Sequence, residues 1–358
     1  MEDVRDVTIV EVAAQAGVSV STVSRILNNR PDVAKRTRER VLNVIKQLGF
    51  EPHAPAQRLA GGKSRTIAVL YPLEQPGEEP VNQLHLDFTI GAATAAGESQ
   101  YFCNLLTNPV TAESLLGLFR GRNIDGLILM EVYLDDWRVN LLREHELPFT
   151  LVGRTADESA TDFTDLDIET GVSDAFGHLV TLGHRAIGFL TYAGHLRTNG
   201  FGPAVRAWSG YQRSLAAHDL PPIAHELRFT AEDMAEATHA LLDEHPGLTA
   251  IVSLTDAPTG AVINALIDRG LRVPDDVSVV GLATDRMADM LSPPLTAIQF
   301  PAYDMGFMAA SRLIHQLERR PEPARSTVVT PQLVVRGTTA APSAERRPES
   351  LPLDRTAG

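Results

Sequence analysis

Residues 8–28 constrain this chain most, because their pattern predicts two short helices joined by a tight turn. Thr8 followed by Glu11 is a capping box, which marks the start of a helix. The apolar residues that recur at helical spacing after it are Val10, Ala13 and Ala14. Gly17 supplies the backbone angles that a turn between crossing helices needs. The segment therefore predicts helix, turn and helix.

The second helix of this pair is expected to present polar side chains on one face. Ser19 caps it. We expect its outward side chains to be Ser21, Thr22, Ser24 and Arg25, and its inward ones to be Val23, Ile26 and Leu27. Small hydroxylated side chains let a backbone approach closely, and an arginine one turn on reaches base edges, which suits the DNA major groove. An ordinary amphipathic hairpin is the alternative.

A third helix is predicted over residues 35–48, ending at Gly49. Its apolar face consists of Val41, Val44, Ile45 and Leu48. Its first turn carries Lys35 and Arg36, which oppose the helix dipole and are explained either by phosphate contact or by a solvated basic turn.

The charge is divided unevenly along the chain. Residues 1–65 contain 11 Lys and Arg against 7 Asp and Glu, whereas the remaining residues contain 21 Lys and Arg against 38 Asp and Glu. This basic head on an acidic body is typical of a DNA-binding domain joined to a sensor.

The first two helices resemble the helix-turn-helix of the LacI/GalR family of bacterial transcription regulators. The matching motifs are Val12-Ala13, Ala16-Gly17-Val18-Ser19, Thr22-Val23-Ser24-Arg25 and Leu27-Asn28. The resemblance implies a DNA-binding head over residues 1–50. We expect Val20, Ser21, Thr22 and Arg25 to read bases, and Ser19, Ser24, Asn28 and Arg30 mainly to contact the DNA backbone. Thr8 is also expected to belong to the DNA-binding surface.

Residues 51–65 resemble the hinge of that family, with a short helix expected over 54–60. Leu59 falls where the family places a leucine that wedges into the minor groove and kinks the duplex. The alternative for Leu59 is a linker residue packed on the sensor. His53 and Pro55 depart from the usual hinge sequence.

Residues 66–340 predict an α/β sensor, because short apolar runs alternate with helical stretches. The runs lie at 66–71, 101–106, 124–130, 149–153, 186–190, 250–254 and 277–282. They form two groups, which predicts two doubly wound subdomains facing each other across a cleft, similar to periplasmic sugar-binding proteins. The expected limits are 66–162 with 294–325 for the first subdomain, and 163–293 with 326–340 for the second. The chain should cross between them three times, and 341–358 should be a disordered tail.

Ligands of open parallel sheets lie beyond the carboxyl ends of the strands. The effector-binding candidates at these positions are Asn82, His85, Phe88, Arg154, Arg206, Trp208, Asp256 and Asp285. Ordinary loop capping is the alternative for each of them. Sugar-responsive relatives often have two aspartates where this chain has Ala283 and Thr284, so a typical hexose is less expected. A sugar-like effector, a different metabolite and no ligand all stay open.

The sequence contains no catalytic constellation, phosphate loop or metal-ligand spacing, so we expect no enzyme activity, cofactor or metal. The single cysteine, Cys103, excludes an internal disulfide and fits a reducing cytoplasm. With neither a signal peptide nor a membrane span in its pattern, the chain is expected to be cytoplasmic.

The leading hypothesis is a repressor that binds a palindromic double-stranded DNA operator as a homodimer under effector control. The alternatives are a small-molecule binding protein without a DNA role and an enzyme on the same scaffold.

Overall fold

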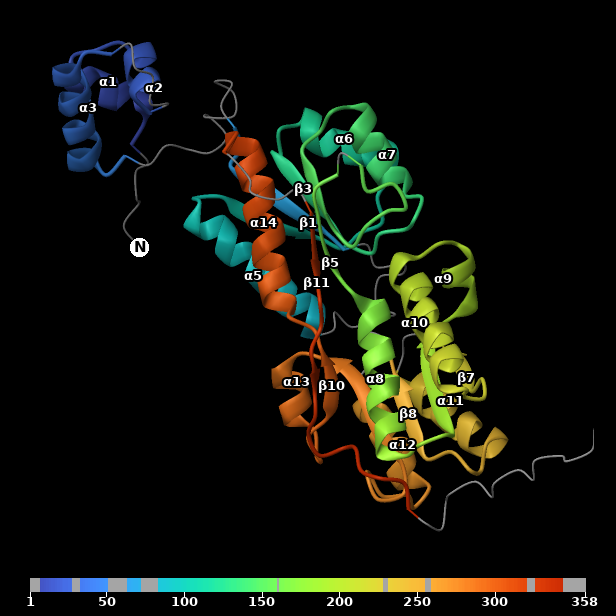
Figure 1. Ribbon diagram of the computed structural model, residues 1–358. Coiled ribbons are helices and arrows are strands. Elements are labelled where there is room, and N and C mark those ends of the chain that lie inside the picture. The colour runs from blue at the N-terminus through green and yellow to red at the C-terminus, as the bar shows by residue number, and fades with distance from the viewer. Residues whose placement is uncertain are drawn as a thin grey trace, which may run out of the picture.

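The computed structural model describes residues 7–27, 33–50, 63–71, 83–159, 161–227, 231–254, 259–320 and 326–343 (Figure 1). They form a small helical head and two α/β subdomains. The head comprises α1 (Ile9–Ala16), α2 (Val20–Leu27) and α3 (Lys35–Leu48). Its core consists of buried apolar residues from all three helices and of Phe50, which follows the Gly49 cap of α3; the helical members are Val12, Ala13, Ala16, Val23, Ile26, Val41 and Val44. Three short helices can close a core in this way only because each contributes one apolar face.

The apolar face of α1 differs from the one expected. Val10 is 60% exposed and Ala14 is also exposed, whereas Val12 and Ala16 are buried. The buried positions still follow a helical spacing, but the helix is rotated so that its Val12 side packs on α2 and α3. The sequence offered two apolar stripes, and the packing of three helices selected one.

The first subdomain contains a six-stranded parallel sheet in the order β11-β5-β4-β3-β1-β2. Its strands are β1 (Thr66–Leu70), β2 (Phe102–Leu106), β3 (Gly126–Leu129), β4 (Phe149–Val152), β5 (Phe163–Leu166) and β11 (Ser326–Val329). Its helices are α5 (Gln83–Glu98), α6 (Ala112–Arg120), α7 (Trp137–Glu144) and α14 (Ala302–Glu318). Helices α5 and α14 pack on one face of the sheet, and α6 and α7 pack on the other.

The second subdomain contains a six-stranded sheet in the order β12-β10-β9-β8-β6-β7, in which only β12 is antiparallel to its neighbour. Its strands are β6 (Ile187–Tyr192), β7 (Ala224–Leu227), β8 (Ala250–Ser253), β9 (Ser278–Ala283), β10 (Thr296–Gln299) and β12 (Leu333–Val334). Its helices are α8 (Ile168–Leu182), α9 (Gly194–Thr198), α10 (Gly202–His218), α11 (Ala231–Glu244), α12 (Gly260–Asp268) and α13 (Asp285–Met290). The central strands β6, β8 and β9 are buried along their whole length, as expected of a parallel sheet that is covered by helices on both faces.

The chain crosses between the two sheets three times, and each crossing lies one strand further along the chain than the limit expected from the sequence. The crossings follow β5, β10 and β11. The limits expected from the sequence were 162/163, 293/294 and 325/326. Each of these three strands hydrogen-bonds within the sheet that the chain is about to leave, and a local apolar pattern does not say which sheet a strand will join.

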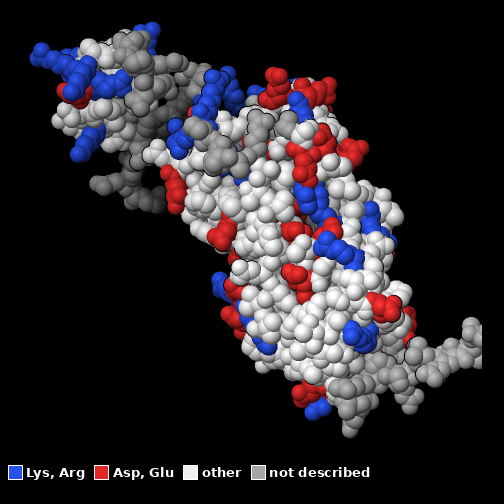
Figure 2. All heavy atoms as spheres, in the orientation of Figure 1, with Lys and Arg blue, Asp and Glu red and all other residues white. Residues whose placement is uncertain are grey.

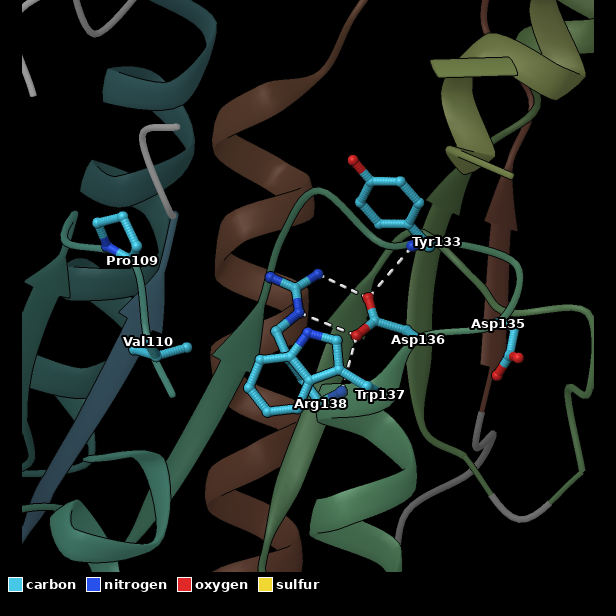
Figure 3. Close-up of a pocket in the computed structure, with 7 residues that line it drawn as sticks. All are labelled: Pro109, Val110, Tyr133, Asp135, Asp136, Trp137 and Arg138. Carbon is cyan, nitrogen blue, oxygen red and sulfur yellow. Dashed lines mark hydrogen bonds and ion pairs between the residues drawn. The ribbon is translucent and has the colours of Figure 1, made fainter. Parts of the chain in front are cut away.

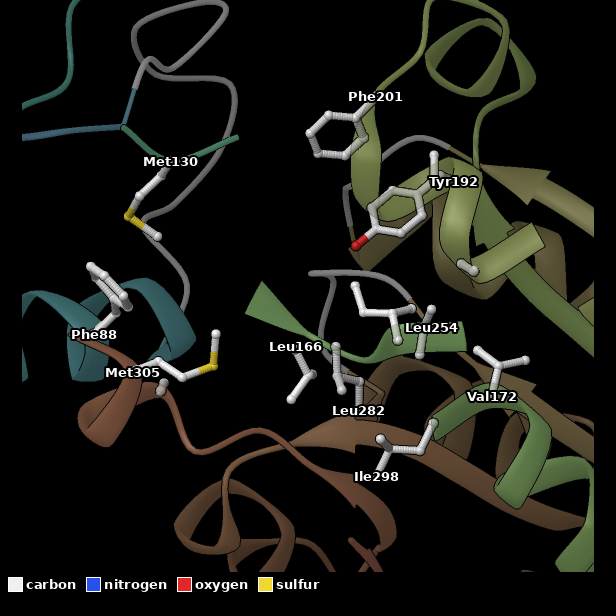
Figure 4. Close-up of a cluster of buried hydrophobic side chains, with 14 of the residues drawn as sticks. Phe88, Met130, Leu166, Val172, Tyr192, Phe201, Leu254, Leu282, Ile298 and Met305 are labelled. Carbon is white, nitrogen blue, oxygen red and sulfur yellow. The ribbon is translucent and has the colours of Figure 1, made fainter. Parts of the chain in front are cut away.

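One continuous apolar cluster joins the two subdomains. Phe88, Met130 and Met305 come from the first subdomain, and they face Leu254 and Leu282 of the second across Leu166 (Figure 4). Strand β5, which carries Leu166, leads directly into the first crossing. The apolar cluster therefore runs beneath the carboxyl ends of strands from both sheets, which is where the sequence placed the cleft.

Candidate nucleic-acid interface and inter-subdomain cleft

The helix-turn-helix geometry is built by local interactions that the sequence predicted. Thr8 Oγ1 accepts from the Glu11 backbone N–H at 3.4 Å, and Glu11 Oε2 accepts from the Thr8 backbone N–H at 2.8 Å. Gly17 ends α1 in the left-handed conformation, with φ of +62°, and its N–H bonds to carbonyls of the last turn. Only glycine adopts this conformation without steric strain, so the direction of α2 after the turn depends on this one residue.

The solvent face of α2 carries hydroxyl groups and one guanidinium. Ser19 Oγ accepts from the Thr22 backbone N–H at 3.2 Å and lies 2.8 Å from the hydroxyl oxygens of both Ser21 and Thr22. Ser19, Ser21 and Arg25 are exposed, and Val20 is 40% exposed. Thr22 and Ser24 are half-buried. The face is therefore a row of short polar side chains on a rigid helix, with an arginine one turn further on.

The head also gathers positive charge. Figure 2 shows Lys and Arg side chains over much of its described surface. Helix α3 contributes Lys35 and Arg36 at its start, where Ala34 makes no side-chain capping bond. Positive charge at a helix N-terminus is unfavourable in the folded head alone, and it becomes favourable beside a phosphate.

Five of the expected site residues lie outside the described part of the chain. They are Asn28, Arg30, Leu59, Asn82 and Asp256. The expected hinge helix over 54–60 and residues 344–358 of the expected tail also lie outside it.

The cleft contains a cavity of about 70 Å³ at the carboxyl ends of the first subdomain's strands. His85 and Phe88, both expected from the sequence, line it from α5. Gly153, Asp165 and Phe300 line it from other elements, and sequence reasoning missed them. The His85 ring centroid lies 4.0 Å from that of Tyr71.

A network of two arginines and one carboxylate lies at the edge of the cavity. Arg154 Nε donates to Asp165 Oδ2 at 2.9 Å, and Arg206 Nε lies 3.7 Å from the same oxygen. Arg154 also pairs with Glu158 at 2.8 Å. Burial raises the pKa of Asp165, against the opposing effect of both guanidiniums, and burial lowers the pKa of Arg206. The only signal for Asp165 in the sequence was an acidic residue in an otherwise apolar run.

The network also bridges the subdomains. Arg206 belongs to α10 of the second subdomain, and its Nη2 donates to the Arg154 carbonyl of the first at 2.9 Å. Beside it the Leu134 N–H donates to the Gly200 carbonyl at 2.7 Å, and the Gly202 N–H donates to the Val132 carbonyl at 3.0 Å. These hydrogen bonds fix one relative placement of the two subdomains.

Arg154 and Arg206 adjoin this cavity only through Asp165, and the other two described candidates, Trp208 and Asp285, do not line it either. Trp208 lies under the Arg197 guanidinium, at 3.9 Å from carbon Cζ to the ring centroid, and packs near Tyr211. Asp285 accepts hydrogen bonds from Gln299 Nε2 at 2.6 Å and from Arg336 Nη2 at 2.7 Å. Both side chains are held by contacts within the second subdomain.

Neither a metal cluster nor a membrane span is found in the part of the chain that the structure describes. No group of three His, Cys, Asp or Glu side chains there could hold a metal ion. None of the helices described is both long and apolar enough to cross a bilayer.

Comparison with known proteins gives two family matches that together cover more than half of the chain. Residues 8–53 match the model described as bacterial regulatory proteins, lacI family, and residues 176–339 match that of a periplasmic binding protein-like domain. The chain is 33% identical to the HTH-type transcriptional regulator MalR of Streptomyces coelicolor over 352 residues, which cover 94% of this chain and 97% of that protein.

Two solved structures extend the comparison over the whole fold. A lac repressor dimer bound to its operator and the anti-inducer ONPF is similar with a TM-score of 0.78 at 25% identity, covering 94% of this chain and all of that one. The complex of the transcriptional regulator CelR with cellobiose is similar with a TM-score of 0.68 at 27% identity, covering 93% of this chain and 99% of that one.

Proposed function

This chain belongs to the LacI family of bacterial regulatory proteins and is a DNA-binding transcription regulator, and from that premise we propose how its sites divide the work. The head reads an operator, and the cleft between the subdomains takes a small-molecule effector. We propose that the protein acts as a homodimeric repressor on a palindromic site, as its similarity to an operator-bound repressor dimer supports. We further propose that it works in the cytoplasm and catalyses no reaction.

The observation that carries the DNA-binding proposal is the solvent face of α2. Its hydroxyl groups and the Arg25 guanidinium lie on one exposed side of a helix whose other side is buried in the head core. Such a helix can enter the major groove without unfolding the head. We assign base contacts to Val20, Ser21, Thr22 and Arg25, and mainly backbone contacts to Thr8, Ser19, Ser24, Asn28 and Arg30. Leu59 is proposed as the minor-groove wedge.

The test is selection of DNA from a random pool by the full-length protein at near-physiological salt. Enrichment of one palindrome supports a sequence-specific dimer, and Arg25→Ala should then lose about 1–3 kcal/mol of binding and relax preference at one base pair. Arg120→Ala, which removes an equal charge from an exposed position on α6, is the matched control. No retention at low salt would instead favour a small-molecule binding protein without a DNA role.

For the effector we propose a sugar-like molecule bound at the network of Arg154, Asp165 and Arg206. Planar bidentate groups such as these suit vicinal hydroxyls, and apolar walls such as Phe88 suit a sugar ring. Ala283 and Thr284 supply no carboxylate to a hexose, and the Thr284 hydroxyl caps α13 by accepting from the Met287 N–H at 3.3 Å. A modified sugar is therefore a better candidate than a plain hexose.

The effector proposal is tested on the operator that the selection provides. A panel of sugars is screened for a change in operator affinity, and the active sugar is titrated against Arg206→Ala. We expect this variant to bind operator normally and to lose the sugar response. An unchanged response in Arg206→Ala would place the effector elsewhere.

A further inference from the structure

A second cavity lies in the first subdomain, at the loops that follow β2 and β3. Its volume is about 380 Å³, which lies within the range of about 300–1,000 Å³ that is usual for small-molecule sites. The described residues that line it are Pro109, Val110, Tyr133, Asp135, Asp136, Trp137 and Arg138 (Figure 3). None of them lines the cavity of the cleft.

The base of this cavity is a buried arginine that is held rigidly on one side. Arg138 is 5% exposed, and its Nε and Nη2 donate to the two carboxylate oxygens of Asp136 at 2.9 and 2.6 Å. Nη2 also donates to the Glu131 carbonyl at 2.6 Å and to the Met130 carbonyl at 3.2 Å. Two of the three guanidinium nitrogens therefore have fixed partners.

The third nitrogen, Nη1, is aimed into the cavity. No described residue accepts a hydrogen bond from it, and Figure 3 shows it on the side of the guanidinium that faces Pro109 and Val110. Although Arg138 as a whole is buried, Nη1 itself is not sealed off from solvent, so it is the guanidinium nitrogen that the cavity leaves open. A ligand that enters the cavity can therefore accept a hydrogen bond from Nη1 without displacing a partner within the described part of the protein.

The charge around Arg138 argues against an anion as that acceptor. Asp136 is 3% exposed and neutralises the guanidinium through two parallel hydrogen bonds. Asp135 is exposed at the rim and accepts from Asn140 Nδ2 at 3.1 Å. Arg138 is the only cation among the described lining residues, so the net charge there is negative. A neutral ligand that both accepts and donates hydrogen bonds fits best.

The remaining lining is aromatic and apolar. Trp137 is 48% exposed at the start of α7, and Tyr133 lies on the same loop. The exposed indole and the fixed donor offer a flat apolar face and a hydrogen-bond donor, and the Asp135 carboxylate adds an acceptor on the other side of Asp136 (Figure 3). These are the three contacts that a sugar ring needs.

We propose that this cavity binds one pyranose ring of a neutral carbohydrate. The C–H face of the ring packs on Trp137, one hydroxyl accepts from Arg138 Nη1, and another donates to Asp135. Binding at this site is independent of the cleft, while its regulatory role rests on the proposed function. A route between the two sites exists because Arg138 holds the carbonyls of Met130 and Glu131, which line the cleft cavity.

The test uses tryptophan emission in the full-length protein. Trp137 and Trp208 are the only tryptophans, so Trp208→Phe leaves Trp137 as the sole indole and Trp137→Phe leaves Trp208. Glucose, methyl glucoside, maltose and cellobiose are titrated into both variants, with inorganic phosphate as the anionic probe. We expect at least one sugar to give a saturable emission change in Trp208→Phe that phosphate does not give.

Affinity variants then assign the contacts. Arg138 itself is a poor target, because removing it strands the buried Asp136 carboxylate and risks unfolding. Trp137→Ala and Asp135→Asn change exposed side chains, and each should weaken binding of that sugar about tenfold by calorimetry, with Trp137→Phe retaining part of the affinity. A flat Trp137 signal with every sugar, an equal response to phosphate, or unchanged affinity in Trp137→Ala would overturn the proposal.

A cleft variant separates this proposal from the function of the cleft. Arg206→Ala should abolish the effect of the effector on operator binding and leave the Trp137 titration intact. Loss of the operator response with the Trp137 signal kept would support two separate sites. If the Trp137 signal vanishes in Arg206→Ala, the sugar binds in the cleft alone and the second site is refuted.

Discussion

The crossing of α5 and α14 gives the sharpest test of how the first subdomain holds its site. The two helices touch through glycines on both sides. A Cβ at Gly91 would lie 2.0 Å from the Tyr303 carbonyl oxygen, and one at Gly306 would lie 2.0 Å from the Phe88 carbonyl oxygen. Both obstacles are backbone, so no side-chain rotation relieves them. We predict that Gly91→Ala destabilises the first subdomain.

The size of the effect follows from this distance. The shortest usual carbon-to-carbonyl-oxygen contacts are about 3.3 Å, so the helices must separate locally by about 1.3 Å. A gap of that order forfeits much of the dispersion energy between the facing side chains, and overpacking costs typically ~1–3 kcal/mol. We take the upper end, about 3 kcal/mol, because backbone opposes backbone. The higher helix propensity of alanine stabilises the helix by up to about 1 kcal/mol, so we expect the free energy of unfolding to fall by about 2 kcal/mol net.

The matched control is Gly97→Ala near the end of the same helix. No atom lies within 4 Å of a Cβ at Gly97, so this change gains helix propensity without a collision. Urea unfolding of both variants is followed through Trp137 in a Trp208→Phe background, because Trp137 belongs to the first subdomain. We expect a lower free energy of unfolding for Gly91→Ala and an unchanged or higher one for Gly97→Ala. Equal stability of the two variants would refute the reasoning.

Further predictions concern the head, the cleft and pH. Gly17→Ala should destabilise the head by about 1 kcal/mol, because φ is +62° there, and thermal unfolding of the head measures it. Asp165→Asn leaves two arginines without their shared carboxylate and should cost about 3 kcal/mol in urea unfolding. His184 bonds to Thr249 and the Ala340 carbonyl, and burial lowers its pKa from 6.5. Because the unfolded chain binds the proton more readily, the contribution of His184 to the free energy of unfolding is complete above pH 6.5 and is lost as the pH falls below 6.5. We expect this loss to be less steep in His184→Gln.

The head was predicted well from sequence because its determinants are local. The capping box spans four residues, and the left-handed glycine follows its helix directly. Such signals do not depend on the rest of the fold. Even so, the buried face of α1 contains Val12 rather than Val10, because tertiary packing decides which stripe is buried.

The cleft was predicted less well because distant segments place its side chains. Asp285 lies at the end of a strand as expected, yet Arg336, far along the chain, captures its carboxylate. Asp165 joins the site because β5 stays in the first sheet until the crossing. Neither outcome can be read from spacing, since each depends on which strand pairs with which. The position of the loops after the strands was enough to locate the cleft. Which side chains line it depends on the pairing of strands that are far apart in the sequence.

The hydrogen bonds across the cleft indicate how a small ligand could control the whole protein. The Leu134–Gly200, Gly202–Val132 and Arg206–Arg154 hydrogen bonds fix the relative placement of the subdomains. At about 1 kcal/mol net for each, they sum to about 3 kcal/mol. Allosteric couplings are typically about 1–3 kcal/mol, equivalent to about 5- to 150-fold in affinity. An effector that contacts Arg206 and Asp165 therefore competes with hydrogen bonds whose total free energy is similar to a typical allosteric coupling free energy. It can shift the subdomains relative to each other without unfolding either one.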